Sequence, residues 1–467
     1  MASFLHPDRL FSSDVTQRQI AQRIYQQISG LPIISPHGHT DPAWFAENEN
    51  FSNAAELLIV PDHYVFRMLY SQGISLSDLG VGLGPLSIDQ AQRVWQTFAD
   101  KYYLFRGTPS SMWLDYVFSD IFDLETPLSS ANASHYFDHI NAKLATEAYK
   151  PRALFDRFNI ETLATTEQPL DQLKHHQKIQ ESSWQGNVIT TFRPDNFTDP
   201  EHPTFANSMV ELATMCNSEL TTFNDYLDAI RQRRVHFKLR GATATDHSHP
   251  TAFTADLDEA TKEHLFQKIK TLSFTPAEAE LFRGQMITEM ATMSIDDGLV
   301  MQLHHGCFRN HNRPLYEQFG TDKGADIPLQ IEFVKALQPL LSKHGNNPNL
   351  TIILFTLDET TYSREIAPLA GHYPALKAGP AWWFHDSPEG MKRFKEQVIE
   401  SAGFYNTVGF NDDTRAFMSI PARHDVARRI DCAALAKLVA EHRLREDEAI
   451  EVAIDLTYNL VKKAYRF

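Results

Sequence analysis

Eight short runs rich in apolar and β-branched residues recur along the chain, and longer segments with helical patterning separate them. In residues 328–344, for example, Ile331 and Leu337 share one helical stripe. Alternating strands and helices predict parallel strands joined by crossover helices, and eight strands favour a closed α/β barrel of the (β/α)8 TIM type over an open doubly wound sheet. The predicted strands are residues 31–35, 162–166, 187–192, 235–239, 300–304, 350–357, 375–384 and 405–410.

The interval between the first two predicted strands is much longer than a crossover helix. Residues 41–159 fill it, and their composition is mainly helical. A segment of this length at a barrel mouth is typical of a covering insertion. We therefore expect residues 1–40 and 160–467 to form the barrel and residues 41–159 to form a mostly helical insertion that caps its mouth.

Charge and cysteine usage exclude several classes of protein. The net charge of -16 argues against a nucleic-acid partner, because binding to phosphate backbones needs a basic surface. The three cysteines, Cys216, Cys307 and Cys432, lie far apart and predict reduced thiols in a cytoplasmic protein. The N-terminus has no signal-peptide pattern, and no run of about 18 apolar residues occurs, so we expect no membrane contact. Assembly into a homo-oligomer is left open.

Polar residues follow three of the predicted strands, at the ends where the active sites of barrels lie. His37 and His39 follow the first strand and share one face of an extended chain, so they can bind one metal ion between them. Imidazole suits ions of the Zn, Mn or Fe class. The eighth predicted strand is followed by Asp412 and Asp413, either of which could add a carboxylate ligand, and the fifth ends at His304.

Each of these signals also has a purely structural interpretation. In a chain with 21 histidines, about one His-x-His triplet is expected by chance, and a second one, from His247 to His249, has no predicted strand directly before it. The pair Asp412 and Asp413 is typical of an exposed turn, and His304 of a hydrogen-bonded core histidine. The position of His37 and His39 directly after an apolar strand favours the metal site.

Several longer motifs are specific when they are taken together in their order. Together they resemble the uronate isomerase family, often called glucuronate isomerase, within the amidohydrolase superfamily of barrels. The similarity extends from His37 to about Arg429. The motifs are PHGHTDP (36–42), DHYVFRML (62–69), RGTPSSMWL (106–114), TFRPD (191–195), the segment with His304 and Arg309, AWWFHD (381–386), and NDDTRAF with SIPARHD (411–425).

The resemblance implies an aldose-ketose isomerase acting on small hexuronates. Its reactions would interconvert D-glucuronate with D-fructuronate and D-galacturonate with D-tagaturonate. It also implies one divalent ion, Zn with Mn as the alternative, held by His37, His39 and Asp413. The choice of Asp413 over Asp412 rests on its spacing to Arg415, and Pro421 is an insertion that could shift the geometry nearby.

The same resemblance implies roles for further residues in moving a proton between C2 and C1 through a cis-enediol. Such a reaction needs a base, a group that stabilises the oxyanion, and a proton carrier. Asp413 is the candidate base, Tyr64 the candidate proton carrier, and His63 would assist ring opening. Tyr64 suits this role because one phenol oxygen both donates and accepts a hydrogen bond.

The resemblance also implies a second set of residues, which would bind the substrate. Arg193 and Arg415 would bind the sugar carboxylate, because a guanidinium can hold a carboxylate with two parallel hydrogen bonds. Asp246 and His304 would bind hydroxyl groups or orient their neighbours.

Two other functions compete with this interpretation. A metal-dependent hydrolase of the same superfamily shares the barrel and the ligands, and Lys238 on the predicted fourth strand would suit the modified lysine that bridges two metals in such enzymes. The motifs outside the metal site weigh against it. The second competitor is a sugar-acid binding protein without activity, which the complete set of acid, metal ligands and tyrosine disfavours.

Overall fold

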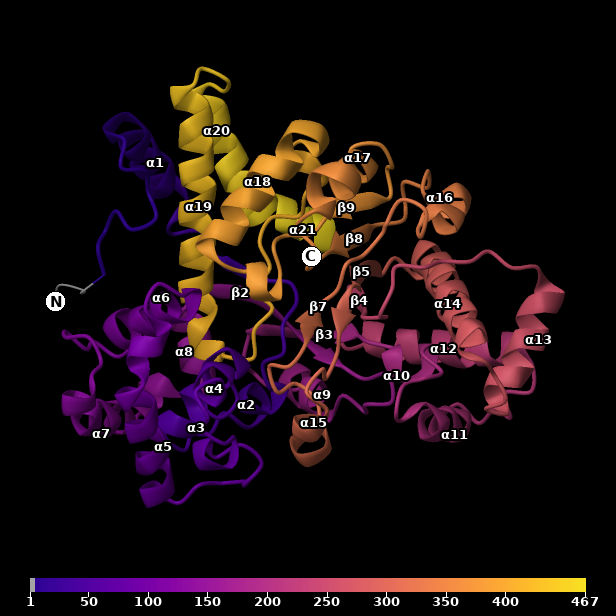
Figure 1. Cartoon of the computed structure of the whole chain (residues 1–467), viewed down its shortest axis with the longest axis horizontal. Helices are drawn as coiled ribbons and strands as arrows, with labels where there is room; N and C mark the ends of the chain where they lie inside the picture. The colour runs from indigo at the N-terminus through magenta and orange to yellow at the C-terminus, as the bar shows by residue number, and fades with distance from the viewer. Residues whose placement is uncertain (1–4) are drawn as a thin grey trace.

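A curled, parallel β-sheet forms the centre of the molecule in the computed structural model, which describes residues 5–467 (Figure 1). Seven strands pair in one parallel order. An isolated parallel bridge from Ala378 to Thr407 adds the eighth position, and the backbone of Thr414 accepts a hydrogen bond from His39 N at 3.0 Å, next to the first strand. The predicted (β/α)8 fold is confirmed. The strands are β1 (Ile33–Ser35), β2 (Ile160–Glu167), β3 (Asn187–Phe192), β4 (Ala244–His247), β5 (Val300–His304), β8 (Ile352–Phe355) and β9 (Leu376–Ala378).

Apolar side chains from strands far apart in the sequence meet in one buried cluster. Ile34 of β1, Val300 of β5 and Val408 belong to it, together with Val461 and Tyr465 of α21 (Leu460–Tyr465). Because side chains alternate along a strand, the same strands present their polar residues one position away from these apolar ones. The cluster thus fixes the side of each strand on which the functional residues appear.

The predicted fourth strand is wrong. Residues 235–239 lie at the end of helix α12 (Phe223–Lys238), which Thr222 begins through a capping box with Asp225. A short apolar run fits a buried strand and a helix equally well, so its pattern alone could not separate them. The observed fourth strand is β4, and the histidine triplet from His247 to His249 therefore begins at the last residue of a strand.

This correction removes the argument for a bridging lysine. Lys238 is exposed at the end of α12, and its Nζ donates a hydrogen bond to the backbone oxygen of Asp297. The lysine is on an outer helix instead of the inner barrel wall, so it cannot carry the hydrolase alternative.

The helix predicted over residues 328–344 is shorter than expected. Helix α16 spans Gln338–His344, and β7 (Ile327–Pro328) pairs antiparallel with β6 (Cys307–Phe308) before it. Pro339 stands in the first turn of α16. Proline is tolerated at the start of a helix but breaks its interior, so the helix begins here.

Residues 41–159 are mostly helical, as expected, and their helices gather at one end of the molecule (Figure 1). Their side chains dominate a second buried cluster, in which Trp95 Nε1 donates to Ala133 O at 3.0 Å. The division of the chain into barrel and insertion stays a prediction. The helices are α2 (Pro42–Glu47), α3 (Ala54–Leu58), α4 (His63–Tyr70), α5 (Ile88–Asp100), α6 (Pro109–Tyr116), α7 (Ala133–Leu144) and α8 (Pro151–Arg157).

The other helices surround the sheet, and α1 (Val15–Ile28) lies against α19 (Ile420–Ala440). No helix within residues 5–467 combines the length and apolar character that crossing a bilayer requires. The remaining helices are α9 (Lys174–Gln180), α10 (Asp195–Thr198), α11 (Phe205–Met215), α13 (Glu259–Lys270), α14 (Pro276–Asp297), α15 (Arg313–Phe319), α17 (Ala367–Ala370), α18 (Pro388–Ala402) and α20 (Glu446–Ile454).

The closure of the barrel can be tested at Gly409, which has a φ of 77° and faces the C-terminal helices. A methyl group there would collide with Leu456 O and Val461, whereas Gly73, with a φ of 83°, has open space around it. We expect Gly409→Ala to lower the free energy of unfolding by about 3 kcal/mol and Gly73→Ala by about 1 kcal/mol. Urea denaturation measures both, and equal losses would contradict this account of the closure.

Candidate active site and metal centre

A cavity at the carboxyl ends of the strands brings all the predicted site residues together. The ends of β4 and β5, the segments that follow the strands, and α4 supply its walls, as expected for a barrel whose site lies at this end. Nine of the lining residues are the predicted ones, namely His37, His39, His63, Tyr64, Arg193, Asp246, His304, Asp413 and Arg415. The others include Ser248, Cys307, Arg309, Asp322, Asp326, Trp382 and Trp383.

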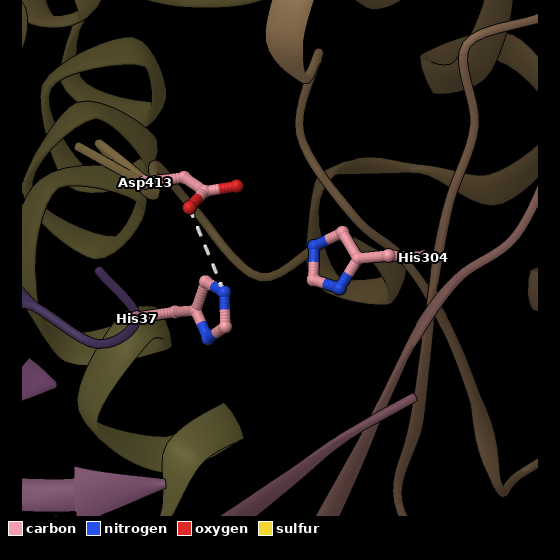
Figure 2. A group of neighbouring side chains, drawn as sticks. All are labelled: His37, His304 and Asp413. Atoms are coloured by element: carbon pink, nitrogen blue, oxygen red, sulfur yellow. Dashed lines mark ion pairs between the residues drawn. The ribbon is translucent and has the colours of Figure 1, made fainter. Parts of the chain in front are cut away.

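Asp413 lies among imidazole rings in this cavity. Its Oδ1 is 3.1 Å from His39 Nε2 and 3.6 Å from His37 Nε2, and ligand atoms of His37, His304 and Asp413 all lie within 4.8 Å of one another. Figure 2 shows one oxygen of Asp413 facing His37 while the other points away from it. His37 and His304 are buried. The group therefore has the size and composition of a metal site.

Hydrogen bonds orient two of these rings. The side-chain amide of Gln302 lies 3.3 Å from His37 Nδ1, and His304 Nδ1 lies 2.7 Å from Asp246 Oδ1. A carboxylate accepts a hydrogen bond, so Nδ1 of His304 carries a proton, and in the neutral ring Nε2 is the atom that holds the lone pair. Among the described residues, this buried Nε2 has no hydrogen-bond partner. A lone pair in this setting, aligned by a carboxylate, suits a metal ligand.

Burial and mutual charge keep the ligand atoms in the form that binds a cation. Burial lowers the pKa of His37 to about 4, so its imidazole is neutral at physiological pH. Burial also acts to raise the pKa of Asp413, but His37 and His39 overcome this effect and hold its pKa far below the ordinary range. Neutral imidazoles and an ionised carboxylate are the donors that divalent transition metals prefer. The residues present therefore fit such an ion.

The backbone aims Asp413 and its neighbour Asp412 in different directions. Asp413 has a φ of 38°, in the left-handed region that few residues other than glycine adopt. Asp412 Oδ2 instead lies 2.9 Å from His424 Nε2. The structure thus brings Asp413, and not Asp412, to the histidine pair, and the left-handed backbone lies in the turn that carries the candidate ligand.

Three arginines line the cavity, and acidic residues accompany each of them. Arg193 contacts Asp195 at 3.0 Å and Asp246 at 3.4 Å, and it donates to Ser248 Oγ at 2.9 Å. Its pKa is raised, because the two carboxylates outweigh the effect of burial, which acts to lower it. Arg193 thus keeps its positive charge beside the cavity.

The other two arginines have partners on the segment between α15 and β7. Arg309 contacts Asp326 at 2.7 Å and donates to Ser248 Oγ at 3.0 Å, while Arg415 contacts Asp322 at 2.9 Å. None of the sequence motifs assigns a role to Ser248, Asp322 or Asp326. Ser248 could have been found if β4 had been placed correctly, whereas the two aspartates are in a loop with no strand signal before it.

His63 and Tyr64 reach the cavity from α4. Tyr64 is buried, burial raises its pKa, and its hydroxyl donates to Trp383 O at 3.2 Å. Burial, with Arg415 adding to it, lowers the pKa of His63 to about 3, and His63 Nδ1 has no hydrogen-bond partner among residues 5–467. Both side chains are therefore neutral at physiological pH, with polar atoms available to a ligand.

Buried neutral histidines make stability depend on pH. Unfolded imidazoles take up protons below about pH 6.5, whereas the folded ones do not, so the free energy of unfolding falls as pH falls from about 6.5 to 4.5. Each contributes up to about 1.4 kcal/mol per pH unit in this window. Burial raises the pKa of Glu167 to about 8 and that of Asp386 to about 7, which opposes the trend, but fewer groups act this way. The histidines are His37 and His176, with pKa values of about 4, and His63, His247 and His305, with values of about 3.

Urea denaturation at pH 7.5, 6 and 5 measures this dependence. His176→Gln should reduce the slope, because its ring is buried beside Thr165, and His135→Gln on the exposed face of α7 should leave it unchanged. A free energy of unfolding that stays constant between pH 7 and 5 would refute the argument.

Comparisons with known proteins show the family to which the chain belongs. The family model for glucuronate isomerase matches residues 1–465. A uronate isomerase from Xanthomonas axonopodis pv. citri is 62% identical, and one from Rhizorhabdus wittichii is 59% identical, each over 99% of this chain and 98% of the relative. The crystal structure of glucuronate isomerase from Caulobacter crescentus has a TM-score of 0.97 at 59% identity, over 99% of this chain and 97% of its own. The crystal structure of uronate isomerase from Thermotoga maritima has a TM-score of 0.92 at 25% identity, over 99% of this chain and 100% of its own. The chain belongs to the glucuronate isomerase family.

Proposed function

We propose that the protein is a uronate isomerase that interconverts D-glucuronate with D-fructuronate and D-galacturonate with D-tagaturonate. The observation that carries this proposal is the pairing of two features in one cavity. An ionised carboxylate, Asp413, lies among the histidines, and guanidinium groups such as Arg415 line the same cavity. A uronate has an acidic C–H bond beside its carbonyl at one end, which a carboxylate base can deprotonate, and a carboxylate at the other end, which a guanidinium can bind.

Asp413 is the proposed base that removes the proton from C2. Its Oδ1 contacts His37 and His39, which leaves Oδ2 to face a substrate. Its low pKa makes it a weak base, so the transfer depends on stabilisation of the enediol that forms. Neutral His37 and the positively charged arginines surround the cavity in which this negative charge develops.

Tyr64 is the proposed proton carrier between the neighbouring oxygens O1 and O2. Its phenol is fixed by the hydrogen bond to Trp383 O, and the Arg423 guanidinium lies 4.9 Å from the centre of its ring. A neutral phenol can donate one proton and accept another through the same oxygen. His63, next to it on α4, is the proposed acceptor for the hydroxyl proton during ring opening, and its neutral state suits this role.

The proposed carboxylate site consists of Arg193, Arg415 and, as an addition to the predicted set, Arg309. The Nε atoms of Arg309 and Arg415 are buried without hydrogen-bond partners in the described chain, so these groups have capacity for another ligand. Both oxygens of Asp246 are engaged, one by His304 and one by Arg193. We therefore propose that Asp246 orients these two residues and does not bind a sugar hydroxyl.

A divalent ion, Zn or Mn, would be held by His37, His39 and Asp413, with His304 Nε2 as a further donor facing the same space. When bound, such an ion acts as a Lewis acid that stabilises negative charge on the carbonyl oxygen of a substrate. The hydrolase alternative is not favoured, because the lysine on which it depended is on an outer helix.

Two further proposals concern the setting of the reaction. Residues 41–159 supply His63 and Tyr64 to the cavity, which supports their role as a cap over the barrel mouth. The three unpaired thiols support work in a reducing compartment, the cytoplasm. The net charge of -16 supports a small hexuronate and no nucleic acid as the partner.

Formation of ketose from D-glucuronate and D-galacturonate tests the function directly. We expect the wild-type protein to convert at least one of them, and Asp413→Asn to reduce kcat by at least about a hundredfold while the fold persists. Asparagine tolerates the left-handed backbone of this turn, so circular dichroism should show an unchanged melting curve. Asp228→Asn, on the exposed face of α12, is the matched control. If the wild-type protein forms no ketose, the proposed function is refuted. Near-normal turnover in Asp413→Asn would refute the role of Asp413 as the base.

Metal content tests the proposed centre. We expect about one ion per chain, to be lost together with activity in His37→Ala and after treatment with a chelator, because removal of one ligand typically costs more than tenfold in affinity. His135→Ala, which removes an exposed imidazole, should retain the ion. Elemental analysis gives the stoichiometry, and two tightly bound ions per chain would support a hydrolase instead.

A further inference from the structure

Asp322 places a carboxylate of the protein at the proposed carboxylate site. Its Oδ2 lies 2.9 Å from Arg415 Nη2, and both side chains line the cavity. The side chain of Asp322 is 40% exposed and that of Arg415 is 33% exposed. The pair is therefore open to a ligand that enters the cavity.

The acidic partners of the other two arginines are held differently. Asp246 is 1% exposed and is bound to His304, and Asp195 also accepts a hydrogen bond from Ser248 N at 3.1 Å. Asp326 accepts one from Asn310 N at 2.9 Å. Asp322, by contrast, accepts a long hydrogen bond of 3.5 Å from the hydroxyl of the adjacent Thr321, in addition to its contact with Arg415. Asp322 is thus the least firmly held acid at the site.

The loop around Asp322 is anchored at its base and has open space beside Gly320. At the base, Asp326 contacts Arg309, its carbonyl accepts a hydrogen bond from Trp383 Nε1 at 3.0 Å, and His311 N donates to Ala325 O at 2.9 Å. At the tip, Gly320 has a φ of 78° and open space around it, and Asp322 itself has a φ of 60°. Such a tip can change its dihedral angles while the base stays fixed.

The electrostatic surroundings of Asp322 match what a substrate carboxylate needs. Burial acts to raise the pKa of Asp322, but Arg415, His39, Arg193 and Arg309 overcome it and hold this pKa far below its usual range. The four groups converge on an ionised carboxylate. A sugar acid entering the cavity is stabilised by the same three guanidinium groups, those of Arg415, Arg193 and Arg309, so the two carboxylates compete for one place.

We propose that Asp322 is a specificity-determining residue whose carboxylate holds Arg415 until the carboxylate of a uronate replaces it. The proposal rests on the proposed isomerase function for the identity of the substrate. A uronate offers Arg415 an equivalent partner, so the exchange costs little. A neutral aldose offers none, and the pair between Asp322 and Arg415 then stays in the cavity and excludes it.

Removing the competing charge should therefore strengthen the binding of sugar acids. We expect Asp322→Asn to lower the KM for D-glucuronate on the order of fivefold, as for loss of a partly exposed ion pair. The same variant should bind L-gulonate, a sugar acid without an aldehyde, more tightly by a similar factor in calorimetry. Asp322→Glu keeps the charge and should remain close to wild type. Glu317→Gln removes a negative charge from the exposed surface of nearby α15 and should leave both constants unchanged.

The opposite results would overturn the proposal. A higher KM and weaker L-gulonate binding in Asp322→Asn would show that Asp322 binds the sugar directly, and unchanged constants would show that it does not compete. L-gulonate binding needs no turnover, so it tests the role of Asp322 separately from the isomerase function. A wild-type protein that binds L-gulonate but forms no ketose would refute the isomerase function, while the affinities of the variants would still decide the role of Asp322.

Discussion

The contact of Asp413 with His37 and His39 is the constraint on which the rest of the site depends. It joins the segment after the first strand to the segment after the last one, so it exists only if the barrel closes. The hydrogen bond from His39 N to Thr414 O holds the same two segments together through their backbones. Closure of the barrel and assembly of the candidate metal centre are therefore one event.

A second constraint is the balance of charge inside the cavity. Three arginines converge on it, and each has an acidic partner, so the positive charge needed for a sugar acid is kept without leaving a guanidinium unpaired. The partners differ in how they are held. Asp246 is buried and is bound to His304 as well as to Arg193, so it connects the arginines to the candidate metal ligands. Asp322 is on a loop whose backbone can change conformation.

The pattern of apolar residues predicted much of the fold, and the one strand that it predicted wrongly has a physical explanation. Six predicted strands overlap observed ones, and the run at 405–410 contains the bridge at Thr407, because buried parallel strands leave distinct apolar runs. The run at 235–239 was wrong, since helix α12 buries Phe237 by a 3.6-residue period that so short a segment cannot reveal. That error also hid Ser248, which follows the fourth strand.

The sequence by itself determined the alternation of strands and helices, the positions of His37, His39 and Asp413 near strand ends, and membership of a family. Those properties depend on local order along the chain, which motifs and periodicity record. Only the tertiary structure decided that Asp413 and not Asp412 faces the histidines, because one left-handed backbone angle sets this direction. It likewise decided that Asp322 meets Arg415 across a separation of many residues, since a loop contact of this kind leaves no periodic signal in the sequence.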